Sequence, residues 1–510
     1  PGGPFLSRTS LRLFRLRFSR RTLFKLEAPG EESEHVAGEE SRTPGGKSAA
    51  RMDSSRAPLF LPEPREREWP NRYTYVLAGI ACLNSLNLGY DTGSIGGAAV
   101  IIEDDLGLSD EEQQIFIGAA SIMSIFGALL APPLCDHYGR RKTFLFSCVV
   151  FITGLLLVTA SVDFAAIMVG RVITGLGIGL GLAIDPLYIS EISPPWHRGH
   201  LVSMSEISIN FGIVLGFLAN LAFYSLPENI SWRIIIGIGI LMPMVLAVLV
   251  VFKMPESPRW LVAQKRTEEA KQILSKTYPP GVDMDAVIGE IEAVLEKEQE
   301  GAKEGWKPIL RPSPAVKLML LAGVGLGIMQ QLNGSEAFIY YSPRILEDAG
   351  FDDRGQLFAF MVLIGMCKLS FIGVGAYYVD DTGRRPLLMR STLLMALFLT
   401  LLAFSFPEHN LSGLTIFLIC AFVGAFSIGV GPICWLGVAE VFPLHLRAKA
   451  MSLATFANRA TAALVANTVI TLNNEIGVTG FFLLYAGFTL FSCYYLYRYF
   501  PETMGKTLEE

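Results

Sequence analysis

The sequence predicts an all-α membrane protein whose twelve transmembrane helices form two six-helix halves. Three observations lead to this prediction. Apolar residues make up 51% of the 510 residues and charged residues only 17%, whereas a soluble domain carries about 25% charged residues. The apolar residues gather in runs of about 20, the length of a helix that crosses a bilayer. Short motifs also recur in the same order about 245 residues apart, as expected of a duplicated half.

The duplication is visible in three motifs, each present twice. They are a Gly-Arg-Arg step after an apolar run, a glutamate seven residues before an arginine, and a Pro-Glu-Ser/Thr step. The first copies begin at Gly139, Glu191 and Pro255, and the second copies at Gly383, Glu440 and Pro501. Repeats of this length between apolar runs are typical of membrane transporters.

Twelve runs are long and apolar enough to span a bilayer. Because no water is available there to bond the backbone, each must be helical. The predicted spans are 75–98, 115–134, 143–161, 165–187, 201–224, 233–252, 315–341, 357–379, 387–406, 412–437, 448–472 and 480–499.

Charged residues sort into alternate loops between these spans. The loops after even-numbered spans are basic, as at Arg140-Arg141, and the other loops are acidic, as at Asp352-Asp353. Since positively charged loops remain in the cytosol, both termini and the long central loop are predicted to be cytosolic. The protein is therefore expected to be a multi-pass membrane protein in contact with the lipid bilayer.

The domain organisation follows from the spans and from two polar segments. The N-terminal segment is rich in Arg and Ser and its first Met is Met52, so residues 1–51 are either a transit peptide or sequence upstream of the true start. The polar central loop has helical spacing of apolar residues, with a solvated linker as the alternative. The predicted parts are a disordered segment 1–70, a first half 71–253, a cytosolic helical linker 254–312, a second half 313–500 and a cytosolic tail 501–510.

Two ionisable residues inside the first half suggest proton coupling. Asp91 lies in the first span and Arg171 in the fourth. Ionisable groups within a bilayer are costly and usually face the bundle interior and a partner. A carboxylate that approaches an arginine in only one conformation can bind a proton in the other. The alternative is a permanent structural ion pair between the two helices.

A second set of polar residues lies in the later spans. Amides and carboxylates can hold hydroxyl groups bidentately, and an aromatic ring offers a flat apolar face. The set therefore predicts a site for a polyhydroxylated solute, with helix–helix bonding as the alternative. Its members are Gln330, Gln331, Glu336, Lys368, Trp435 and Asn458.

Across about residues 70–510 these motifs resemble the sugar porter family of the major facilitator superfamily. Motifs that carry the resemblance include Gly139-Arg-Arg141, Gly170-Arg171, Pro255-Glu-Ser-Pro-Arg-Trp260, Gln330-Gln331, Gly383-Arg-Arg-Pro386 and Pro501-Glu-Thr503. The resemblance implies the major facilitator fold and transport by alternating access. It assigns proton coupling to Asp91 and Arg171. It also implies a cytosolic gate network of charged residues, which falls on Asp136, Arg140, Arg141, Glu191, Arg198, Glu256, Arg259, Arg384, Arg385, Glu440 and Arg447.

The chain departs from the hexose carriers of this family at several positions. Glu206 replaces a glutamine in the fifth span, Glu336 replaces an asparagine in the seventh, and Lys368 replaces an asparagine in the eighth. In these places the chain resembles plant polyol transporters. The departures add Glu206 to the predicted solute site, where opposite charges facing one cavity would leave a polar site for polyols or inositol.

We therefore expect a proton-coupled symporter of a polyol, an inositol or a monosaccharide. A facilitative sugar uniporter and a non-transporting sugar sensor are the alternatives. No nucleophile–base pair, metal cluster or phosphate loop suggests an enzyme. We expect no cofactor or metal apart from H⁺ as the coupling ion, no nucleic-acid partner, and function as a monomer. The plasma membrane is the expected location, with the tonoplast and the plastid envelope as alternatives.

Overall fold

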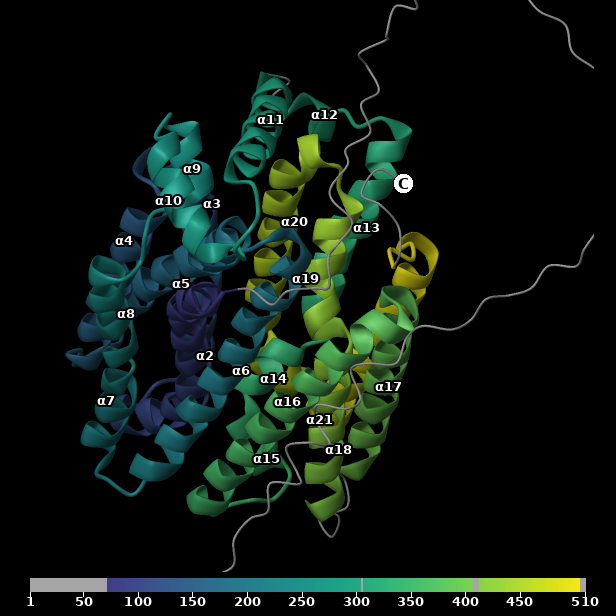
Figure 1. Cartoon of the computed structure of the whole chain (residues 1–510). Helices are drawn as coiled ribbons and strands as arrows, with labels where there is room; N and C mark the ends of the chain where they lie inside the picture. Colours follow the sequence, from purple (N-terminus) through teal and green to yellow (C-terminus); the bar gives the residue numbers. More distant parts are fainter. Residues whose placement is uncertain (1–70, 304–305, 407–411, 505–510) are drawn as a thin grey trace, which may run out of the picture. The chain divides into compact units, whose positions relative to one another are not determined.

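The computed structural model describes residues 71–303, 306–406 and 412–504. In these ranges every regular element is a helix (Figure 1). The described residues belong to one compact unit, which lies within Arg65–Glu510. The predicted disordered segment 1–70, including the candidate transit peptide, lies outside the described residues, as do residues 505–510 of the predicted tail.

The helices that correspond to the first six predicted spans follow one another directly, and a short 3₁₀ turn at Pro195–His197 is the one other regular element described among them. They are α2 (Arg72–Leu106), α3 (Asp110–Tyr138), α4 (Arg140–Thr159), α5 (Phe164–Ile192), α6 (Arg198–Phe223) and the consecutive pair α7 (Glu228–Ile238) and α8 (Leu241–Phe252).

The helices of the second half are interrupted more often. They are α13 (Pro314–Leu332), α14 (Ser335–Tyr340), α15 (Ser342–Asp348), α16 (Arg354–Thr382), α17 (Arg384–Ser405), α18 (Ser412–Ile428), α19 (Val430–Val441), α20 (Leu444–Ala466) and α21 (Val469–Tyr499).

Ten helical segments of the described chain are long and apolar enough to cross a membrane. The two predicted spans that do not meet this measure correspond to α2 and α20. These helices carry buried polar groups, among them Asp91 on α2 and Arg459 on α20. The lower hydropathy therefore reflects polar side chains that face other helices, which a bilayer tolerates.

Two predicted span boundaries are wrong. The eleventh span is predicted at 448–472, but α20 ends at Ala466 and α21 begins at Val469. The twelfth span is predicted at 480–499, but α21 starts before it and contains a kink at Gly477, where φ is 70°. The turn consists of only two residues, Asn467 and Thr468, and apolar residues resume directly after it, so hydropathy averaged over a span does not detect it.

The described residues of the central polar segment form four helices. These are α9 (Pro258–Ala263), α10 (Thr267–Thr277), α11 (Met284–Lys303) and α12 (Lys307–Leu310). Leu261, Ala270, Leu274 and Ile288 form part of a small apolar core of their own. The backbone carbonyl of Thr277 accepts a hydrogen bond of 2.8 Å from Thr74 at the start of α2. We call this end of the bundle the linker end and the opposite end the far end.

Glycines set the positions of two features that matter for the site. Gly89 on α2 lies so near α6 that a Cβ there would be 1.9 Å from the carbonyl oxygen of Ile209. Gly334 has φ 78° and separates α13 from α14, a left-handed conformation that glycine adopts without steric cost. The first glycine allows two helices to touch, and the second breaks a helix near the bundle interior.

Candidate functional site

The predicted proton-coupling residues form an ion pair between α2 and α5. Nη1 of Arg171 lies 3.2 Å from each carboxylate oxygen of Asp91. The side chain of Asp91 is 3% exposed and that of Arg171 is 1% exposed, so water screens their attraction very little. The guanidinium also lies 5.1 Å from the centre of the Phe116 ring. The structure therefore brings together the two residues that the sequence predicted as a pair.

Several polar atoms beside this pair have no hydrogen-bond partner among the described residues. They are Nη2 of Arg171 and both side-chain polar atoms of Asn87, which lies one turn before Asp91 on α2. Asn87 is 1% exposed. A buried amide without partners is costly, so Asn87 is a candidate for contact with a bound solute or water. Sequence analysis missed it, although its place one turn before Asp91 was a usable signal.

The predicted glutamines and asparagine of the second half form one cluster of amides. Nδ2 of Asn458 donates to Oε1 of Gln330 and to the carbonyl oxygen of Gly327, both at 2.8 Å. Nε2 of Gln331 donates to Oδ1 of Asn458 at 3.4 Å. Nε2 of Gln330 reaches the carbonyl oxygen of Gly431 at 3.4 Å, just after the break between α18 and α19. The helix break thus supplies an acceptor to the cluster.

Glu336 pairs with Arg459, a residue that the predicted site did not include. Two parallel contacts of 3.2 Å join the guanidinium of Arg459 on α20 to the carboxylate of Glu336 on α14. Arg459 also donates to Oδ1 of Asn458 at 2.7 and 2.9 Å. The position of Arg459 inside a span, directly after Asn458, was the signal that could have identified it.

Glu206 and Lys368 lie near each other on opposite halves. Glu206 lies on α6 and Lys368 on α16, and each is an electrostatic neighbour of the other and of Glu336. Both are half-buried. Within the described ranges neither charged group makes a hydrogen bond or ion pair, although the Lys368 ammonium lies 5.8 Å from the centre of the Phe426 ring. Both groups are therefore available to a bound molecule.

The remaining predicted solute residue, Trp435, lies on α19 and is half-buried. Tyr340, on α14, was not predicted and connects the two sets of residues. Its hydroxyl lies 3.4 Å from Oγ1 of Thr92, next to Asp91, and it is an electrostatic neighbour of Asp91 and Glu336. The Tyr-Tyr-Ser-Pro sequence that starts at Tyr340 was its signal.

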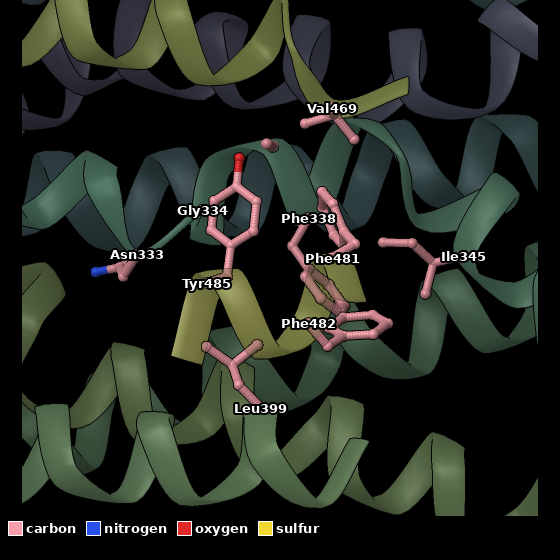
Figure 2. Close-up of a pocket in the computed structure, with 10 residues that line it drawn as sticks. Asn333, Gly334, Phe338, Ile345, Leu399, Val469, Phe481, Phe482 and Tyr485 are labelled. Carbon is pink, nitrogen blue, oxygen red and sulfur yellow. The ribbon is translucent and has the colours of Figure 1, made fainter. Parts of the chain in front are cut away.

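A small apolar pocket lies on another side of α14. Figure 2 shows it between the rings of Phe338, Phe481 and Phe482, with Gly334 at its edge. None of the predicted site residues lines it. Its wall is almost entirely apolar, so it cannot hold a polyhydroxylated solute, but it leaves the packing behind α14 incomplete.

The first copy of the gate network is built around the start of α4. Nη2 of Arg140 lies 2.7 Å from Oε1 of Glu191 on α5. Oε1 of Glu256 accepts hydrogen bonds from the backbone N–H groups of Arg140 and Arg141 at 2.7 and 3.2 Å. A carboxylate is stabilised at a helix N-terminus, so Glu256 caps α4.

The second half repeats this arrangement at the start of α17. Nη2 of Arg384 lies 3.3 Å from Oε1 of Glu440. Glu502 accepts from the backbone N–H groups of Arg384 and Arg385, both at 3.0 Å. Burial raises the pKa of Glu502, but these bonds and that of Met504 outweigh it, so the pKa is below its usual value. Glu502 is the counterpart of Glu256 and was missing from the predicted network.

The other predicted members of the network lie around these two centres. Asp136 is 3.6 Å from Arg140, Arg259 pairs with Glu298 at 2.7 Å, and Arg447 donates to the carbonyl oxygen of Phe442 at 3.0 and 3.1 Å. Arg198 is an electrostatic neighbour of Arg447 from the other half. Nη2 of Arg141 and Nη2 of Arg385 donate to the backbone carbonyls of Val251 and Tyr497, which are equivalent positions at the ends of α8 and α21.

At the far end, polar contacts join the two halves. Arg354 on α16 pairs with Asp104 and, at 3.2 Å, with Glu228. Oε1 of Gln114 on α3 accepts from the backbone N–H groups of Ile470 and Thr471 at 2.9 and 3.1 Å. In contrast, the Arg140–Glu191 and Arg384–Glu440 pairs at the linker end each lie within one half. The halves are thus held together at the far end in this conformation.

The family profile described as "Sugar (and other) transporter" matches residues 77–510. The chain belongs to this sugar transporter family. The resemblance predicted from the motifs is confirmed, and with it the all-α major facilitator fold.

Relatives in the sugar transporter family include proteins with polyol and sugar names. The probable polyol transporter 4 of Arabidopsis thaliana is 39% identical over 86% of this chain and 84% of its own length. The arabinose-proton symporter of Bacillus subtilis is 31% identical over 86% of this chain and 94% of its own. The xylose transporter XylE from E. coli, in an inward-open conformation, matches with TM-score 0.74 and 25% identity over 86% of this chain and 99% of its own.

Proposed function

We propose that the chain is a proton-coupled symporter that moves a polyol, an inositol or a monosaccharide across a membrane by alternating access. The buried Asp91–Arg171 pair is the observation that carries this proposal. The pair lies on α2 and α5 of the first half, and the amide cluster lies in the second half. Polyol transporters and a proton symporter among the relatives support it.

In this mechanism Asp91 exchanges the proton. When Asp91 is charged, Arg171 holds it at 3.2 Å. When the proton is bound, the carboxyl is neutral and the attraction is lost. A ligand drives a conformational change only through its different affinity for the two conformations. Proton binding therefore favours whichever conformation separates Asp91 from Arg171.

The solute is proposed to bind between the halves, at the amide cluster and at the two unpartnered charges. Glu206 accepts hydroxyl hydrogens and Lys368 donates to hydroxyl oxygens, so a polyol can bridge the groups across the halves. Trp435 offers an apolar ring face to C–H groups. Asn87 adds an amide from α2.

The gate network is proposed to open and close the linker end, and this end is proposed to be cytosolic because of its basic loops. In the present conformation the far-end contacts of Arg354 and Gln114 join the halves. The structure then corresponds to the state that is closed to the outside. We propose that one chain is sufficient for transport.

Proton coupling is tested with Asp91→Asn in proteoliposomes. The variant is expected to lose uphill accumulation of solute driven by a pH gradient and to keep counterflow exchange, which needs no gradient. Glu111→Gln, an exposed far-end carboxylate, is the matched control. Concentrative uptake that survives in Asp91→Asn would refute the proposal.

The solute class is tested by uptake of labelled hexoses, inositols and acyclic polyols, with and without a pH gradient. The Glu206 and Lys368 arrangement predicts competition by acyclic polyols. Hexose binding without competition from any acyclic polyol would exclude the polyol assignment. Uptake that does not depend on pH would instead favour the facilitative uniporter.

A further inference from the structure

Glu336 occupies the repeat position of Asp91. It follows Asp91 by 245 residues, and each carboxylate lies two residues after a glycine, Gly89 and Gly334, that are also 245 residues apart. This spacing lies within the range that relates the duplicated motifs of the two halves. The two acidic residues are therefore equivalent positions of the first and seventh spans.

Each of these carboxylates is paired with an arginine of its own half. Asp91 pairs with Arg171 on α5 and Glu336 with Arg459 on α20. The arginine has thus moved to another helix while the carboxylate has kept its place. Glu336 is 26% exposed, against 3% for Asp91, so its carboxylate has easier access to water in this conformation.

We propose that Glu336 is a second proton-binding carboxylate of this transporter, so that two protons move with each solute. This inference rests on the proposed symport function and deepens it. Glu336 takes up a proton when the site faces outside. It releases the proton to the cytosolic side as its carboxylate forms the two contacts with Arg459 seen here.

Charged side chains from three other helices lie near this carboxylate. Arg459 on α20 contacts it, and Glu206 on α6 and Lys368 on α16 are its electrostatic neighbours. Tyr340, on the same helix α14, is a titratable neighbour of Glu336 and of Asp91 on the packed helix α2. The balance between these groups changes if α14 moves relative to α6 and α16, because opposite and like charges act over short distances.

Arg459 links this proton to the solute site. It donates to Oδ1 of Asn458, which in turn bonds Gln330 and Gln331. When Glu336 is protonated, Arg459 loses a charged partner and the bonds to Asn458 become its main contacts. Proton binding at Glu336 therefore changes the amides that are proposed to hold the solute, which is what coupling requires.

The position of Glu336 also suits a group that changes its surroundings. It lies on α14, a short helix bounded by the left-handed Gly334 and by the turn at Tyr341. Behind α14 is the incompletely packed apolar pocket of Figure 2, which Ala337 and Phe338 help to line. A short helix with a hinge glycine before it can change its direction without moving α13.

The test measures the opposing solute gradient at which net flux reverses, in proteoliposomes with the membrane voltage clamped at zero and a gradient of one pH unit. Each coupled proton then balances about a tenfold solute gradient, since 1.4 kcal/mol is a factor of ten. Wild type is expected to reverse near a hundredfold gradient and Glu336→Gln near tenfold. Glu111→Gln should match wild type.

Reversal of wild type near tenfold would overturn the inference while leaving proton symport intact. An unchanged hundredfold value in Glu336→Gln would also overturn it. Absence of any gradient-driven uptake in wild type would instead overturn the proposed function itself, and the inference with it. Counterflow exchange checks that Glu336→Gln still folds and binds solute. If Glu336→Gln loses exchange, the second variant is Glu336→Asp, which keeps an ionisable group. Glu336→Asp is expected to show exchange and to reverse near a hundredfold solute gradient. Reversal of Glu336→Asp near a tenfold gradient would count against the second proton site.

Discussion

Removing the two partners of the Asp91–Arg171 pair one at a time is predicted to have unequal effects. At 3.2 Å, two unit charges attract by about 5 kcal/mol at an effective dielectric constant of 20. Desolvation opposes this gain, and removal of one partner from a buried pair costs about 3–5 kcal/mol because the other charge is left uncompensated. Asp91→Asn leaves Arg171, which cannot lose its proton in a protein. Arg171→Met leaves Asp91, which can become neutral by binding a proton.

Asp91→Asn is therefore expected to lower stability by the full amount at every pH. Arg171→Met is expected to cost little at acid pH and more as the pH rises, because a lone Asp91 must then be charged or bind a scarcer proton. The double variant should be less destabilised than the sum of the single variants, with a coupling of at least about 1 kcal/mol. Thermal unfolding of the purified protein, followed from pH 5 to pH 8, measures all three.

Equal, pH-independent losses in the two single variants would refute this reasoning, and so would additivity in the double variant. The control is Asp104→Asn, at an exposed far-end pair. Exposed pairs contribute about 0–1 kcal/mol, so this control should shift the melting temperature by a small fraction of the shift in Asp91→Asn.

Three further predictions concern the scaffold. Gly89→Val should prevent folding, because a Cβ there would lie 1.9 Å from a backbone oxygen of α6. Gly79→Ala should leave folding unchanged, because a Cβ there would have nothing within 4 Å. Expression levels and size-exclusion profiles of the two variants test this. Arg354→Ala removes two ion pairs across the far end and should increase solvent accessibility there, measured by cysteine labelling of engineered far-end positions; unchanged labelling would contradict it. Glu502→Ala should lower the free energy of unfolding by about 1–2 kcal/mol through loss of the α17 cap. Because the pKa of Glu502 is lowered, this stabilisation should be present above the usual carboxyl pKa and disappear only as the pH falls through the lowered value. A cap effect that vanishes at neutral pH would contradict this prediction.

The fold could be predicted from the sequence because its signals are local or periodic. Apolar runs identify the spans, and repeated motifs identify the two halves. The Asp91–Arg171 pair was also predictable, since two charges inside one half of a membrane bundle have few alternative partners. Boundaries failed where a turn is too short to interrupt an apolar run, as at the two residues between Ala466 and Val469.

The composition of the site was less predictable, because the choice of partner is a tertiary property. Lys368 is opposite in charge to Glu336, yet Glu336 pairs with Arg459. Which of two cations a carboxylate reaches depends on the rotation of α14 after Gly334 and on the face that α20 presents to it. Neither is encoded by spacing along one helix. The position of Asn87 one turn before Asp91 could have drawn attention to it, but only the packed structure reveals that its amide has no partner among the described residues.

The charged pairs are of two kinds, those within one half and the one formed by residues of opposite halves, and the two kinds have different proposed roles in coupling. The Asp91–Arg171 and Glu336–Arg459 pairs each lie within one half, so separation of either pair requires a movement of helices within that half in addition to rocking of the halves. Glu206 and Lys368 belong to opposite halves, so the same rocking changes the distance between them. A solute that bridges Glu206 and Lys368 therefore stabilises only those conformations in which both reach it, whereas a proton acts on conformations through its own half. We propose that Arg459 couples these two kinds of pair, because it pairs with Glu336 and is an electrostatic neighbour of Glu206.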